Sequence, residues 1–175
     1  MDEKNTKHIL SIMVDNEPGV LARVVGLFSG RGYNIESLSV SEVDSHKFLS
    51  RITVVTSGTK LIVDQIKAQL GKLIPVHNLV DITELDSFIG KELILVKLDI
   101  KNINLFNLLN RLKKIGIKVL LENNNELIVE YAGTPEEITK LVKLLKNTKI
   151  IEQTRSGLVS IATGTDYIKN KEGKK

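Results

Sequence analysis

Residues 15–43 read DNEPGVLARVVGLFSGRGYNIESLSVSEV, and this stretch decides the fold. It predicts the end of one strand, a glycine-containing turn, an amphipathic helix that ends at Gly30 and Gly32, and a second strand. Apolar residues recur within it at helical spacing and are expected to share the face that packs on the core: Leu21, Val24, Val25 and Phe28. The stretch therefore predicts a strand–helix–strand unit.

The turn before this helix has the chemistry of a site for a free amino acid. Pro18 is expected in the first helical turn, where a backbone N–H has no partner in any case. Such a turn presents free N–H groups and a partial positive charge, so the backbone around Gly19 and Val20 is expected to hold a carboxylate. Asn16 and Asn34 bracket the helix, and their amides can bind either an ammonium or a carboxylate group. The alternative is that these residues only shape the connection, because Gly and Asn are common in turns.

Outward from this stretch, the chain predicts the order βαββαβ, which is the ferredoxin-like arrangement. Thr59 is placed to cap the second helix, whose apolar stripe is Ile62, Ile66, Leu70 and Leu73. The strands of this first unit are expected at residues 8–14, 34–43, 48–56 and 76–83.

The same order begins again after a polar connector at 84–92. Asn104 is expected to open the first helix of this half, and Thr134 to Glu137 form a capping box before the second. Strands are expected at 93–100, 117–121, 126–131 and 150–163, the last with a bulge at Ser156-Gly157. The sequence thus predicts an α+β protein with two ferredoxin-like domains of the α/β-sandwich type, at 7–84 and 93–168, and a lysine-rich tail at 169–175.

Composition narrows the class of protein. The chain has 175 residues, 42% of them hydrophobic, which supports packed domains. It has no cysteine, which excludes disulfides and thiolate chemistry. The tail supplies +3 of the net charge of +4, so the body is nearly neutral. No membrane-spanning run or signal peptide is recognisable, and a cytoplasmic protein without membrane contact is expected.

The motifs of several functional classes are missing. The three histidines have no metal-ligand spacing, and no catalytic constellation is present, so no catalytic residue and no metal site is predicted. The glycines at 26, 30 and 32 do not open a helix after a strand, which excludes a dinucleotide fingerprint. The predicted central strand at 48–55, FLSRITVV, lacks the stacking aromatics of RNA-binding domains, so no nucleic-acid partner is expected.

The runs HILSIMVDNEPGVLARVVGLFSGRGYNIESLSV (8–40) and LSRITVV (49–55), with TRSG at 154–157, closely resemble the regulatory (small) subunit of acetolactate synthase, also called acetohydroxyacid synthase. The resemblance covers about residues 7–168. It implies an N-terminal ACT domain that binds an effector and a C-terminal domain typical of the family. Ala22 departs from the pattern, because some bacterial members have serine there.

The resemblance also implies a function. Members of this family have no catalysis of their own; they activate a separate catalytic (large) subunit, which carries thiamine diphosphate, FAD and magnesium. They confer feedback inhibition by valine or a related branched-chain amino acid, bound between the ACT domains of a homodimer. Carried over to this chain, the effector contacts are Asn16, Pro18, Gly19, Val20 and Leu21 of one subunit, with Asn34 and Ile35 of the other. The alternative is a tandem ACT-type amino-acid sensor that regulates another enzyme or a transcription factor.

Overall fold

The structure is a computed structural model that describes residues 5–101 and 104–163. The described chain forms two compact units, one made of residues 5–90 and 158–163 and the other of 91–157. The predicted lysine-rich tail at 169–175, and residues 164–168 of the predicted second domain, lie outside the described residues.

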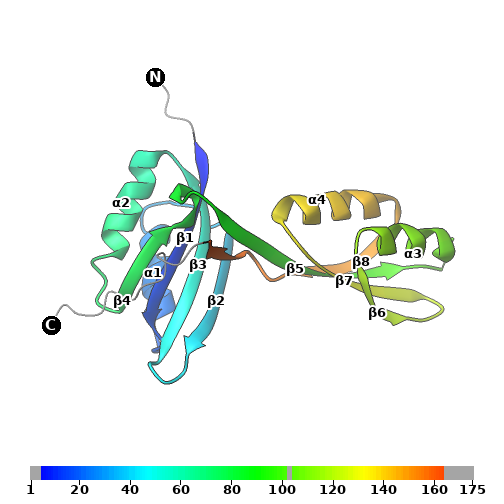
Figure 1. Ribbon diagram of the computed structural model, residues 1–175, viewed down its shortest axis with the longest axis horizontal. Coiled ribbons are helices and arrows are strands. Elements are labelled where there is room, and N and C mark those ends of the chain that lie inside the picture. The colour runs from blue at the N-terminus through cyan, green and yellow to red at the C-terminus, as the bar shows by residue number, and fades with distance from the viewer. Residues whose placement is uncertain (1–4, 102–103, 164–175) are drawn as a thin grey trace. The chain divides into compact units, whose positions relative to one another are not determined.

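The first unit has the predicted βαββαβ order (Figure 1). Its sheet has the strand order β2-β3-β1-β4, in which β3 lies between β1 and β2 and is antiparallel to both. Alternate strand residues such as Ile12 and Ile52 point to one face, where they form a core with Val24 and Phe28 of α1 and Ile66 of α2. The elements are β1 Thr6–Asp15, α1 Val20–Ser29, β2 Ser37–Asp44, β3 Leu49–Gly58, α2 Lys60–Leu70, β4 Val76–Asp81 and the short 3-10 helix η1 Ile82–Glu84.

The ends of α1 differ from the prediction in two ways. Pro18 lies before the helix, because Gly19 is the N-cap residue and α1 begins at Val20. The buried face of α1 includes Val20, and Leu21 is 40% exposed, so the prediction of Leu21 as a core residue is wrong. The later helix start explains the difference, because Val20, Val24 and Phe28 then form the core stripe at a spacing of four residues.

The second unit repeats the order, with β5, β6, β7 and β8 as strands and α3 and α4 on one face of its sheet (Figure 1). Its strand order is β6-β7-β5-β8, and leucine, isoleucine and valine side chains fill the space below the helices. The elements are β5 Phe88–Asp99, α3 Leu105–Lys114, β6 Lys118–Glu122, β7 Glu126–Gly133, α4 Pro135–Leu144, the 3-10 helix η2 Leu145–Asn147 and β8 Lys149–Arg155. The strand β9 Val159–Ala162 follows them in the chain and belongs to the first unit.

The predicted last strand, 150–163, is not continuous. It divides into β8 and β9 around Gly157, which has φ 78°, a conformation that favours glycine. From Leu158 the chain packs with the first unit, where Ser39 Oγ donates to the Leu158 carbonyl at 2.8 Å. The predicted connector is also shorter than expected, because β5 begins at Phe88, and β9 pairs with β5.

The predicted capping box of α4 is present and gives a first testable result. Thr134 Oγ accepts from the Glu137 N–H at 3.2 Å, and the Glu137 carboxylate accepts from the Thr134 N–H at 2.7 Å. Thr134→Ala should lower the free energy of unfolding by about 1 kcal/mol, since a capped N–H group loses its acceptor. Thr139→Ala, on the exposed side of the same helix, is the matched control and should change stability less. Denaturant titration of both variants checks the expectation, and equal losses would contradict it.

The same capping box contributes to the stability of the fold in a way that depends on pH. The hydrogen bond from the Thr134 N–H, with Lys91 as the second partner, holds the pKa of Glu137 below its usual value. A lowered folded-state pKa stabilises the fold above the usual carboxyl pKa, and that contribution is lost as pH falls through the lowered value. The stability difference between wild type and Glu137→Gln, measured by denaturant titration at several pH values, should therefore shrink in acid.

Candidate functional site

The loop between β1 and α1 is exposed on the first unit. Its exposed residues are Asn16, Glu17, Pro18 and Gly19. The Asn16 N–H donates to the Phe48 carbonyl at 2.6 Å. Gly19 has φ 84°, and a Cβ built on it would meet nothing within 4 Å. The space over Gly19 is therefore not filled by the described residues.

The start of α1 presents backbone donors beyond the predicted Gly19 and Val20. The Gly19 N-cap provides no side-chain acceptor, and the Val20 N–H donates to the Glu17 carbonyl at 3.3 Å. Within the part of the chain that the structure describes, the N–H groups of Leu21 and Ala22 have no backbone acceptor. Free N–H groups in a first helical turn attract anions. The N–H groups of Leu21 and Ala22 are thus backbone donors of the kind that anions accept from, and Ala22 was not among the predicted residues.

The side chains at the helix start divide into two kinds. Val20 is 4% exposed and belongs to the core, so only its backbone can take part in binding. Leu21 points outward and offers apolar contact next to the free N–H groups. A ligand on this turn would therefore meet polar backbone and one aliphatic side chain, which are the contacts that an aliphatic amino acid needs.

The second predicted half of the site lies far from the first within one chain. Asn16 is bonded to the carbonyl of Phe48, whereas the Asn34 carbonyl accepts from Thr56 Oγ at 2.7 Å. Phe48 precedes β3 and Thr56 lies near its other end, which separates the two halves by roughly 25 Å at the rise of an extended strand. The helix α1, together with the residues before and after it, takes the chain from one end of the sheet to the other. A single chain does not bring Asn16 and Asn34 together.

The Asn34 half is rich in hydrogen-bond acceptors. Asn34 itself is exposed, and Ile35 is half-buried against the core. Glu36 follows, and its carboxylate accepts from the Ser57 hydroxyl and pairs with Lys7 at 2.9 Å. The hydrogen bond from Ser57, and then that from Lys7, lower the pKa of Glu36, so this carboxylate is charged near neutral pH. Glu36, which was not among the predicted residues, thus adds a charged carboxylate, paired with Lys7, to this half.

The Arg155–Gly157 segment that carries the sequence resemblance has a structural role in the second unit. The Arg155 guanidinium donates to Glu92, with Nε at 2.8 Å from the carboxylate, and Glu92 is buried. Ser156 Oγ accepts from the Leu93 N–H at 3.0 Å. These contacts fix the end of β8 against β5 within the second unit.

Two further findings concern the described residues only. No three or more His, Asp or Glu side chains in 5–101 and 104–163 are grouped so that they could hold a metal ion. None of the helices in these ranges has the length and apolar character needed to cross a membrane.

Comparison with known proteins gives consistent results for both halves of the chain. Residues 10–78 match the family described as "AHAS small subunit-like ACT domain", and residues 91–164 match "Small subunit of acetolactate synthase". The chain is 37% identical over 164 residues to the acetolactate synthase small subunit of Mycolicibacterium smegmatis, covering 94% of this chain and 95% of the relative. It is 33% identical over 159 residues to the acetolactate synthase isozyme 3 small subunit of Escherichia coli, covering 90% and 96%.

A solved structure agrees with these sequence relationships. The crystal structure of the acetolactate synthase small subunit from Thermotoga maritima superimposes with a TM-score of 0.84 at 26% identity, covering 91% of this chain and 99% of the other. The similarity includes both units, and the first unit is an ACT domain. The chain therefore belongs to the acetolactate synthase small-subunit family.

Proposed function

We propose that this chain is a regulatory subunit that activates a catalytic acetolactate synthase subunit and makes it sensitive to feedback inhibition in branched-chain amino-acid biosynthesis. The observation that carries the proposal is the identity to small subunits over nearly the full length of both chains. The chain itself contributes no cofactor. Thiamine diphosphate, FAD and magnesium would belong to the catalytic partner, which would supply the chemistry of the reaction.

The proposed effector is valine or another branched-chain amino acid, bound between two copies of the ACT domain. The turn at Asn16–Gly19 and the N–H groups of Leu21 and Ala22 would hold the carboxylate. Asn34 and the charged Glu36 of the partner chain would face the ammonium group. Because roughly 25 Å separates these halves within one chain, the geometry supports a site that two chains complete.

Exposed apolar side chains support a homodimer at this edge of the first unit. β2 is an edge strand, and Val40 and Val43 on it are 44% and 47% exposed. An edge strand with exposed valines favours pairing with another strand unless something covers it. Together with Leu21 on α1, these residues provide the surface that the proposed dimer would bury.

The purified chain alone should form no acetolactate from pyruvate and thiamine diphosphate. Mixed with the acetolactate synthase catalytic subunit of the same organism, it should raise that subunit's turnover several-fold, and valine should then lower it. Acetolactate formation by the isolated chain would contradict the proposal. Failure to bind the catalytic subunit in a pull-down, with valine binding intact, would instead favour a sensor that regulates another protein.

A further inference from the structure

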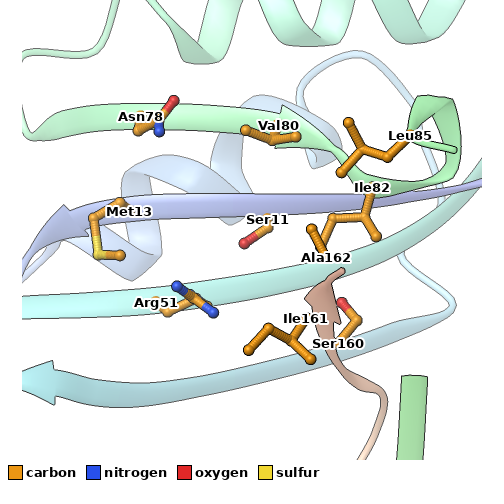
Figure 2. A pocket seen from close by; sticks show the side chains of 10 residues that line it. All are labelled: Ser11, Met13, Arg51, Asn78, Val80, Ile82, Leu85, Ser160, Ile161 and Ala162. Carbon is orange, nitrogen blue, oxygen red and sulfur yellow. The ribbon is translucent and has the colours of Figure 1, made fainter. Parts of the chain in front are cut away.

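A second candidate site lies on the other face of the first sheet. Ser11, Met13 and Arg51 alternate with core residues along β1 and β3, so their side chains point away from α1 and α2. β9 crosses this face, and Figure 2 shows Ile161 of β9 next to Arg51, with Ser160 beyond Ile161. Between them is a cavity of about 30 Å³ that opens to solvent. It is distinct from the effector turn, which precedes α1.

Two buried polar atoms line this cavity without a hydrogen-bond partner among the described residues. They are Nε of Arg51 and Oγ of Ser160. Buried polar groups in folded proteins are nearly always paired, so each such atom needs a partner that the described residues do not supply. They are the only two side-chain atoms of this kind in the described ranges, and both line the same cavity. Their coincidence points to a bound group.

The charge of the lining favours an anion. Arg51 is the only charged residue of the lining, which contains no aspartate or glutamate, and no ion pair joins Arg51 to another described residue. The edge of a guanidinium that contains Nε matches a carboxylate with two parallel hydrogen bonds. Ser160 can donate a third bond to the same anion.

The remaining lining is mostly apolar and selects the kind of anion. Met13, Val80 and Ile161 border Arg51, and Figure 2 shows Met13 and Ile161 on either side of its guanidinium. A volume of about 30 Å³ exceeds the roughly 10–15 Å³ that one water needs. A strongly hydrated anion such as phosphate would leave the aliphatic wall of the cavity without a contact. A carboxylate with a short aliphatic chain would contact both the guanidinium and the aliphatic wall.

We propose that this cavity binds a small aliphatic carboxylate, held by the Arg51 guanidinium and Ser160 hydroxyl with its hydrocarbon chain against Met13 and Ile161. The segment 158–162 would then be a part of a ligand site as well as a cover for the sheet. Because this segment follows β8 directly, the ligand would stabilise the packing of β9 on the ACT domain.

The test uses the full chain and the probe isobutyrate, followed by the ¹⁵N–¹H signal of Arg51 Nε. Isobutyrate should shift this signal saturably, and isobutyramide, which has the same shape without the charge, should not. Binding to the variants is followed by the signal of the Ile161 amide. Arg51→Gln should weaken isobutyrate binding at least tenfold. Arg51→Lys keeps the positive charge but cannot form two parallel hydrogen bonds, and it should weaken binding less. Arg111→Gln, at an exposed arginine of α3, is the matched control and should bind normally.

Gly19→Asp should bind isobutyrate as well as the wild type does, which separates this site from the proposed effector site. An Arg51 signal that isobutyrate leaves unmoved would mean that the cavity holds only water, and would overturn the proposal. Equal shifts from isobutyramide and isobutyrate would also overturn it, since the guanidinium would then play no part in recognition.

Discussion

Gly19→Asp should abolish valine binding at physiological concentrations. The added carboxylate would lie beside the backbone N–H groups proposed to hold the carboxylate of valine. Two like charges about 4 Å apart repel by ~1–4 kcal/mol between the dielectric of water and that of a protein surface. This corresponds to a loss of affinity of about tenfold to several hundredfold. Calorimetric titration of the purified variant with valine measures the loss.

Two control variants separate charge from backbone strain. Gly19 has φ 84°, so any other residue there costs about 1 kcal/mol of stability, even though the space around it is empty. Gly19→Asn has nearly the same shape as Gly19→Asp and the same strain, but no charge, and should retain much more affinity. Gly116→Asp places the same residue at φ 79° in the second unit, also in open space, and should bind valine normally. Equal valine affinity in Gly19→Asp and wild type would contradict the placement of the carboxylate.

Valine should also strengthen the dimer, because each proposed site contains groups from both chains. Binding free energies form a closed cycle, so a ligand that needs the dimer must stabilise it by the same factor by which the dimer improves ligand affinity. At 100 times its dissociation constant, valine would favour the dimer by ~2.7 kcal/mol per site, about a hundredfold in the equilibrium.

Sedimentation across a dilution series, with and without valine, measures this coupling. At that valine concentration the dimer dissociation constant should fall by about two orders of magnitude for each site, and so by about four for the two sites of a symmetric dimer. Isoleucine and leucine run in parallel would rank the effectors, since one methylene group changes affinity by only ~1–3 kcal/mol. A dissociation constant that saturating valine leaves unchanged would place the ligand within one subunit.

The order of elements followed directly from the sequence, and so did the caps. Thr59, Asn104 and Thr134 each accept a hydrogen bond from the third residue after them, as the spacing of polar and apolar residues predicted. These features depend on residues within one helical turn. Local sequence is sufficient for them because their energetics are local.

The predictions from the sequence were incomplete where distant parts of the chain meet. Ser37 and Ser39 were expected only to face away from the core, but they bond the backbone of Leu158, which draws β9 onto the first unit. Leu158 completes a small cluster with Ile9, Val55 and Ile82 on that face. The alternation along β3 places Arg51, Thr53 and Val55 on its second face, but it does not say which segment covers that face. The cavity at Arg51 was missed for the same reason.

The candidate site was identified from the sequence in its residues but not in its geometry. The turn, Gly19 and the two asparagines were selected by their chemistry and by the family resemblance. Their separation along β3 follows from the path of α1, which places Asn16 and Asn34 at opposite ends of the sheet. The free donors at Leu21 and Ala22 depend on where α1 begins, and helix ends are poorly specified by periodicity.

The most direct test of a site shared between two chains is complementation between two inactive variants. Gly19→Asp disables the turn half and Asn34→Ala the other half, so neither homodimer should bind valine. A mixed dimer pairs the intact turn of the Asn34→Ala chain with the intact Asn34 of the Gly19→Asp chain. Co-expression with two affinity tags, followed by tandem purification, isolates the mixed dimer for calorimetry. We expect it to regain one valine site of wild-type affinity; a mixed dimer that binds no valine would contradict a shared site.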